Sequence, residues 1–291
     1  MAGRDGARDP REAAARTGRE RLEAALREPG RSNRLALAAF LTAGFPDRER
    51  FPALLDSVAA VADVVEIGVP FSDPMADGVT IQRASREALA AGVSLRWILA
   101  LLAARPARAG TPIVLMSYLN PLLALGLDRL PGAAADAGVA GLIVPDLPLE
   151  ESDALRAALT PAGIALVQMV TPVTPPDRLE RIGAASEGFT YAVTVTGTTG
   201  GSVAADGDVG RYLDRARAAS RVPLMAGFGI RDAAQVRALA GRADGVIVGS
   251  ALIEAIEAGR DPADFLRRLM ADSQSPPAAE AARPGGREDR T

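Results

Sequence analysis

The sequence contains no cysteine, no histidine and no lysine, so all 33 of its basic residues are arginines. These absences exclude disulfides, thiolate nucleophiles, histidine-bound zinc, Ser-His-Asp triads, Schiff-base lysines and the lysine of a P-loop. Any catalyst in this chain must therefore use carboxylates, tyrosine, hydroxyl groups, backbone amides or a borrowed cofactor, and we expect no metal.

Long hydrophobic runs and a strong excess of charge are also missing. No segment reaches the roughly 18 apolar residues of a membrane helix, and the first ten residues lack the apolar core of a signal peptide. The formal charge is −3 over 291 residues, which offers no basic surface for nucleic acid or an anionic membrane. We expect a cytoplasmic protein that binds neither.

The two ends of the chain differ from its middle. Residues 1–32 are rich in Ala, Arg and Glu and are expected to form an N-terminal extension with at most one short amphipathic helix and no core. Residues 273–291 carry Pro, Gly and charge without periodicity, which predicts a disordered tail. Residues 33–272 are then expected to form a single catalytic domain.

Within that domain, short apolar runs alternate with helix-like stretches, which is typical of an α/β (β/α)₈ TIM barrel. A doubly wound open sheet is the alternative, although it usually has fewer strands. In a barrel, catalytic groups lie where the strands end. The runs are 35–41, 63–69, 112–117, 140–144, 164–170, 189–195, 222–226 and 245–249, and the residues at their ends are Thr42, Glu66, Tyr118, Asn120, Asp146, Thr171, Thr194, Gly227 and Ser250.

Glycines gather at the ends of the last three predicted strands. Gly227 and Gly229 expose backbone N–H groups, Gly249 and Ser250 begin a short helix, and 194–203 is a Gly/Thr-rich loop. Backbone N–H groups at a helix N-terminus favour an anion, and barrels often hold a phosphate at this place. Each motif alone would be read as turn and cap glycines, but together they favour a phosphate site.

Two carboxylates remain to be explained. Glu66 interrupts an apolar strand, and Asp77 follows in a Pro/Gly-rich loop. Glu66 could be the partner of an arginine, and Asp77 could be a turn or cap residue. In a chain poor in other acid–base groups, unlike environments can instead separate two pKa values, with the strand carboxyl protonated and the loop carboxylate ionised.

The stretch "EIGVPFSDPMADGVTIQ" (66–82) resembles the signature of the tryptophan synthase alpha subunit family. Further family-like segments follow in order over residues 33–258. They are "FLTAGFPD" (40–47), "YLNPL" (118–122), "LIVPDLPLEES" (142–152), "TGTTGG" (196–201), "GFGI" (227–230) and "VGSAL" (248–252).

This resemblance implies a (β/α)₈ barrel that cleaves indole-3-glycerol phosphate to indole and glyceraldehyde 3-phosphate. By motif, Glu66 is implied as the general acid–base, Asp77 as the partner of the indole N–H, Tyr191 as a neighbour of Glu66, and Thr199 as the loop residue that orients Asp77. The implied substrate contacts are Gly200, Gly229, Gly249 and Ser250 for the phosphate, and Phe40, Met116, Ile143 and Ile247 for the indole ring. The last four could equally be core alone.

The resemblance also implies a partner, a pyridoxal-phosphate beta subunit in an alpha2beta2 heterotetramer that turns indole into tryptophan. Pro70 and Asp73 are the contact candidates, and the alpha chain itself needs no cofactor. The loop "TVTGTTGG" and Pro145 depart from the family's usual pattern.

Three other functions stay open at this point. A stand-alone indole-3-glycerol-phosphate lyase would need no partner, and a phosphosugar-binding barrel would have no turnover. A phosphosugar isomerase would be favoured by paired Asp residues where this chain has Thr42 and Thr171.

Overall fold

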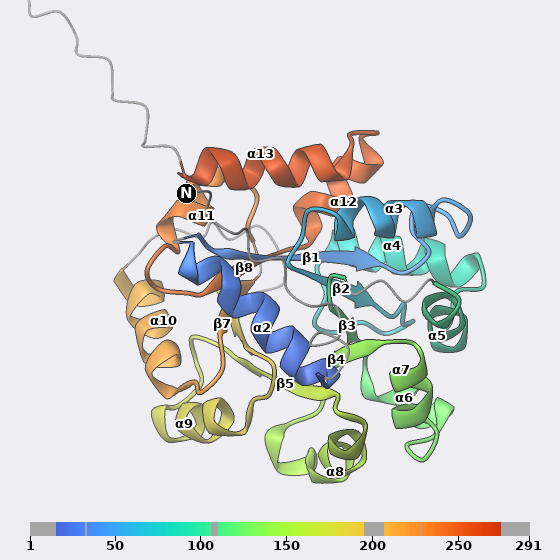
Figure 1. Cartoon of the computed structure of the whole chain (residues 1–291), viewed down its shortest axis with the longest axis horizontal. Helices are drawn as coiled ribbons and strands as arrows, with labels where there is room; N and C mark the ends of the chain where they lie inside the picture. The colour runs from blue at the N-terminus through green and yellow to red at the C-terminus, as the bar shows by residue number, and fades with distance from the viewer. Residues whose placement is uncertain (1–15, 33, 106–109, 195–206, 228, 275–291) are drawn as a thin grey trace, which may run out of the picture.

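The computed structural model describes residues 16–32, 34–105, 110–194, 207–227 and 229–274, and these form a closed barrel of eight parallel strands (Figure 1). Each strand pairs with the next along the chain, and β1 pairs with β8 to close the ring. The predicted (β/α)₈ barrel and its eight strands are therefore confirmed. The strands are β1 (Ala36–Thr42), β2 (Val64–Gly68), β3 (Ile113–Met116), β4 (Val139–Ile143), β5 (Ala165–Val170), β6 (Thr190–Val193), β7 (Leu224–Gly227) and β8 (Gly245–Val248).

Helices cover the outside of the barrel, because each parallel strand must be followed by a crossover that returns the chain to the same end of the sheet. Figure 1 shows them as a ring around the strands. They are α2 (Gly18–Arg31), α3 (Phe51–Ala59), α4 (Val79–Ala90), α5 (Leu95–Ala103), α6 (Leu119–Leu125), α7 (Leu130–Asp136), α8 (Asp153–Leu159), α9 (Pro176–Ala185), α10 (Gly207–Ala219), α11 (Ala233–Ala238), α12 (Ser250–Glu257) and α13 (Pro262–Gln274), with 3₁₀ turns η1 (Leu149–Glu151) and η2 (Thr160–Ala162). Among the described residues, no helix is long and apolar enough to cross a membrane.

The core has two layers, because successive strand residues point to opposite faces of the sheet. One apolar cluster fills the space between strands and helices, and a second fills the inside of the barrel. On β2, Val64 belongs to the inner cluster and Val65 and Ile67 belong to the outer one. Glu66, two residues after Val64, therefore points into the barrel, in register with Phe40 on β1 and Val114 on β3.

Helix α2 closes one end of the barrel. It begins with a capping box between Thr17 and Glu20, and it packs on β1 and β4. Its Leu22 and Leu26 are completely buried and belong to the cluster inside the barrel. The sequence predicted a short helix without a core here, whereas the structure gives this helix two of the largest fully buried side chains.

Helix α12 is an extra helix at the other end of the barrel. It follows β8 directly and contacts both β1 and α4, whereas α13 packs against α3 and α11 in the outer ring. An apolar seam of Phe45, Ala84, Ile253 and Ile256 joins α4 to α12. The chain thus brings the helix after β2 beside the helix after β8.

Candidate active site

Glu66 lies inside the barrel with 2 % of its surface exposed. Neither of its carboxyl oxygens has a hydrogen-bond partner among the described residues. Burial first, and then the nearby charge of Asp77, together raise its pKa from 4.5 to about 8. An unpaired charge in an apolar interior is costly, so Glu66 is protonated at neutral pH.

Asp77 ends the loop between β2 and α4, where it is 8 % exposed. Burial raises its pKa from 3.8 to about 6, and a hydrogen bond from the Tyr118 hydroxyl opposes that rise. The same hydroxyl accepts the Ala76 N–H at 2.9 Å, and the Tyr118 ring stacks on Phe71 with centroids 5.1 Å apart. Tyr118 therefore holds this loop at two points, and Asp77 is ionised at neutral pH.

The two carboxyl groups are close enough for their charges to shift the pKa values of neighbouring groups. Tyr191 on β6 is buried inside the same barrel, and its pKa is raised by burial first and then by the charges of Glu66 and Asp77. A Cβ on Gly227 would lie 2.4 Å from the Tyr191 hydroxyl, so only glycine fits at that point of β7. The structure thus brings Glu66, Asp77 and Tyr191 to one place.

Four apolar side chains proposed as an indole slot also meet inside the barrel. Each is less than 8 % exposed, and all belong to the inner cluster: Phe40, Met116, Ile143 and Ile247. Phe40 is in register with Glu66, and its ring lies over Gly68, where a Cβ would stand 2.4 Å from the ring. A flat apolar ring could therefore lie next to the Glu66 carboxyl group.

The predicted phosphate residues lie at the ends of β7 and β8. Gly229 has φ of +80°, a conformation that favours glycine. Gly249 is the N-cap of α12 and Ser250 its first residue, so backbone N–H groups and the helix dipole point to this spot. The other two predicted loop residues, Thr199 and Gly200, lie outside the described part of the chain.

Tyr118 and Thr42 lie at the barrel mouth. The sequence identified both as polar residues at strand ends but gave them no role. Tyr118 supports Asp77, as described above. The Thr42 hydroxyl at the end of β1 is buried and has no hydrogen-bond partner among the described residues. By contrast, Asp146 accepts the Leu119 N–H at 2.9 Å and so binds the first residue of α6.

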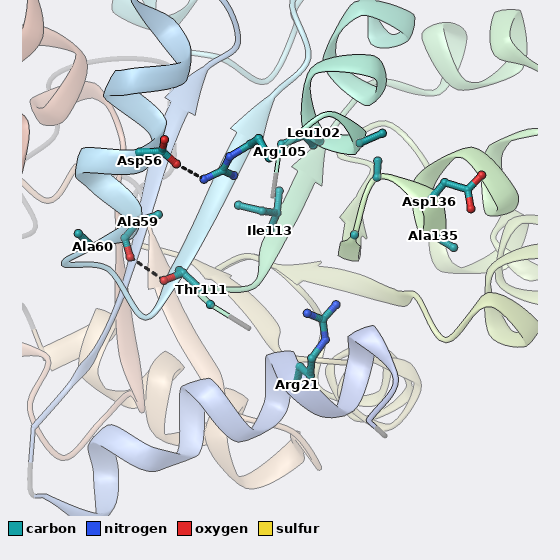
Figure 2. Close-up of a pocket in the computed structure, with 14 residues that line it drawn as sticks. Arg21, Asp56, Ala59, Ala60, Leu102, Arg105, Thr111, Ile113, Ala135 and Asp136 are labelled. Atoms are coloured by element: carbon teal, nitrogen blue, oxygen red, sulfur yellow. Dashed lines mark hydrogen bonds and ion pairs between the residues drawn. The ribbon is translucent and has the colours of Figure 1, made fainter. Parts of the chain in front are cut away.

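A cavity of about 460 Å³ lies away from these groups, between α2, α3, α5 and α7 (Figure 2). It opens around the beginning of β3, the end of a barrel that usually serves stability. Three of its polar side chains are already paired, since Arg105 pairs with Asp56 at 2.5 Å and the Thr111 hydroxyl donates to the Ala59 carbonyl at 2.6 Å. This cavity offers no acid–base pair, so the barrel mouth remains the candidate site.

The mouth can perform acid–base chemistry on a ligand with an apolar ring and an anionic group. One carboxyl group is protonated and one is ionised at neutral pH, an apolar slot adjoins them, and a helix N-terminus follows β8. Within the described residues, no three His, Cys, Asp or Glu side chains are grouped as a metal site would require.

Comparisons with family models and with individual known proteins point to the same family. The family model described as tryptophan synthase alpha chain matches residues 26–281. The tryptophan synthase alpha chain of Nitratidesulfovibrio vulgaris (strain DP4) is 48 % identical over 248 residues, covering 85 % of this chain and 96 % of the relative. That of Deinococcus radiodurans is 43 % identical over 261 residues, covering 89 % and 97 %.

Solved structures agree with the sequence relatives. Tryptophan synthase subunit alpha from Legionella pneumophila str. Paris superposes with a TM-score of 0.76 at 34 % identity, covering 87 % of this chain and 96 % of that one. A chain of Mycobacterium tuberculosis tryptophan synthase superposes with a TM-score of 0.77 at 37 % identity over the same shares.

Proposed function

The chain belongs to the tryptophan synthase alpha chain family, and on that basis we propose how its residues divide the work of the family's reaction. That reaction is the retro-aldol cleavage of indole-3-glycerol phosphate to indole and glyceraldehyde 3-phosphate, so the chain is a carbon–carbon lyase of tryptophan biosynthesis. The observation that carries the proposal is the buried Glu66 carboxyl group, with no partner among the described residues and a pKa of about 8.

In this proposal Glu66 begins the reaction protonated and gives its proton to C3 of the indole ring. The resulting carboxylate takes the proton of the hydroxyl group on the adjoining glycerol carbon. The carbon–carbon bond breaks, its electron pair returns to the ring, and the hydroxyl carbon becomes the aldehyde. Glu66 ends the cycle protonated, so one residue serves as acid and base.

Asp77 accepts the indole N–H and stabilises the positive charge that forms on the protonated ring. Its ionised state at neutral pH supports this role, because its pKa is about 6. Tyr191 borders the Glu66 carboxyl group, and we assign Thr199 the task of orienting Asp77. Phe40, Met116, Ile143 and Ile247 would hold the ring, and Gly200, Gly229, Gly249 and Ser250 would hold the phosphate.

Membership of the family implies a beta chain as partner. We propose further that this partner carries pyridoxal phosphate, forms an alpha2beta2 heterotetramer in the cytoplasm, and docks on the loop with Pro70 and Asp73. Apolar side chains are exposed beside that loop, with Met75 at 77 % and Val79 at 62 %. Isolated exposed apolar residues are ordinary, but two of them flanking Asp77 support a contact surface there.

Indole release from indole-3-glycerol phosphate tests this function, measured for the purified chain alone and with a tryptophan synthase beta chain. We expect slow release alone, faster release with the beta chain, and a loss of about 10²–10⁴-fold for Glu66→Gln. Glu150→Gln, an exposed surface change, is the matched control. Equal and fast release without the beta chain would favour the stand-alone lyase, and substrate binding without release would favour a binding barrel.

A further inference from the structure

One carboxylate near the mouth joins three segments that are far apart in the sequence. Glu254 on α12 accepts a hydrogen bond from the Thr80 hydroxyl on α4 at 3.3 Å, and its other oxygen pairs with Arg231. Arg231 lies in the loop between β7 and α11. Glu254 thus connects the helix after the Asp77 loop with the loop that carries Gly229.

This carboxylate lies close to the proposed phosphate position. Glu254 follows Ser250 by four residues on α12, so the two lie on the same face about one turn apart, about 6 Å along the axis. Helical side chains lean toward the N-terminus. The Glu254 side chain therefore leans toward the end of α12 at which the phosphate would bind.

A free carboxylate at that position would repel a phosphate, because like charges in a partly exposed site still interact appreciably. Arg231 forms an ion pair with Glu254 and so neutralises the negative charge of that carboxylate. We propose that Arg231 is a specificity-determining residue, which allows the site to accept a phosphorylated substrate by neutralising Glu254. This inference rests on the proposed function, and it concerns the affinity for the phosphate group and leaves the carbon–carbon cleavage to Glu66.

The structure supplies a matched control for this pair. Arg83 on α4 and Glu257 on α12 form another ion pair, at 2.5 Å, between the two helices that the Thr80–Glu254 hydrogen bond also joins. Each of these residues lies three positions further along its helix than Thr80 and Glu254, away from the α12 N-terminus. Removing this second charge pair should affect the packing of the helices without placing a carboxylate beside the phosphate.

The test uses four variants of the full chain: Arg231→Gln, Glu254→Gln, the double variant and the control Arg83→Gln. The measured quantities are KM and kcat for indole-3-glycerol phosphate with the beta chain, the Kd of inorganic phosphate by calorimetry, and Tm. We expect Arg231→Gln to raise KM and the phosphate Kd by about tenfold at nearly constant kcat. Glu254→Gln should lower both, since it frees Arg231 and its amide oxygen still accepts from Thr80.

The double variant decides the mechanism, and we expect it to return both constants close to those of the wild type. If the double variant stays as impaired as Arg231→Gln, Arg231 acts by touching the phosphate and the neutralisation proposal is overturned. If Arg231→Gln has no effect, or Arg83→Gln has the same effect, the proposal is overturned as well. A wild type that binds phosphate but releases no indole would instead contradict the proposed function.

Discussion

Glu66 is buried inside the barrel with neither oxygen bonded to a described residue, and its pKa rises from 4.5 to about 8. In the unfolded chain this carboxyl group ionises near its ordinary pKa, while in the folded chain it stays protonated up to about pH 8. Stability is therefore undiminished below the unfolded pKa and falls as the pH rises between the two values. The chemistry that Glu66 is proposed to perform thus has a cost to folding.

The Glu66→Gln variant has no ionisable group at this position, so we expect the variant to be more stable than the wild type at high pH. The advantage should grow by about 3–4 kcal/mol between pH 5 and pH 8, because one pKa unit corresponds to about 1.4 kcal/mol. Urea unfolding at both pH values measures it. Glu150→Gln provides the contrast, since Arg178 lowers the pKa of that exposed carboxyl group and its effect has the opposite sign. If the difference in unfolding free energy between Glu66→Gln and the wild type were the same at pH 5 and pH 8, the raised pKa of Glu66 would be contradicted.

Tyr118 acts on the second carboxylate. Its hydroxyl donates to Asp77 and so limits the rise in the pKa of that group, which is about 6. Tyr118→Phe keeps the stacked ring on Phe71 but removes this bond, and we expect the acid limb of the kcat/KM profile to move up by about one pH unit. Activity should then fall by about twofold at pH 7 and by about tenfold below pH 6.

The control for this change is Tyr212→Phe, which removes another buried hydroxyl that donates to the Val170 carbonyl at 2.8 Å on the outer side of β5. It should leave the pH profile of kcat/KM in place. A shift of the same size in both variants would show that the profile reports general destabilisation.

At the scale of elements, α2 belongs to the barrel although it precedes β1. Leu22 reaches the backbone of two other segments, because a Cβ added to Gly188 would lie 2.6 Å from its Cδ2 atom and one added to Gly141 would lie 3.1 Å away. The helix thus fills the end of the barrel opposite the active site, where side-chain packing contributes to stability.

Leu22→Ala should lower the free energy of unfolding by about 2–5 kcal/mol, the usual range for a buried leucine replaced by alanine. We expect kcat of the folded enzyme to stay the same, since the change lies at the far end of the barrel. Leu123→Ala, on a side chain that is 50 % exposed, should change stability by less than about 0.5 kcal/mol. Denaturant unfolding measured in parallel with activity separates effects on stability from effects on kcat. A drop in kcat without loss of stability would argue against this role for α2.

The same helix shows what could not be predicted: the sequence indicated a short helix here, but not that it would contribute to the core. The strands were visible because each is a short apolar run, and Glu66 was visible because it interrupts one of them. Residues 18–31 are dominated by Ala, Arg and Glu, and two leucines in such a segment do not reveal that a barrel end will cover them. Glu254 and Thr80 are 174 positions apart, and only the closed barrel makes them neighbours.

At the scale of the whole molecule, the proposed chemistry is divided between the two ends of the chain. Both carboxylates come from the β2 segment, while the phosphate position is formed after β7 and β8. The sequence indicated this division through its motifs, because a barrel places the ends of all its strands on one face. It could not indicate that α12 would lie against β1 and α4, which depends on the geometry of closure.

The pairing of β1 with β8 joins Ala36–Ala39 to Gly245–Val248. During synthesis, β1 therefore remains an edge strand, with unpaired backbone groups, until more than four-fifths of the chain has left the ribosome. A nascent or truncated chain could hold Glu66 and Asp77 on its early strands and still lack any place for the phosphate. Catalytic activity would then appear only after β8 has paired with β1 and closed the barrel. Half-barrels made separately should be inactive until they associate.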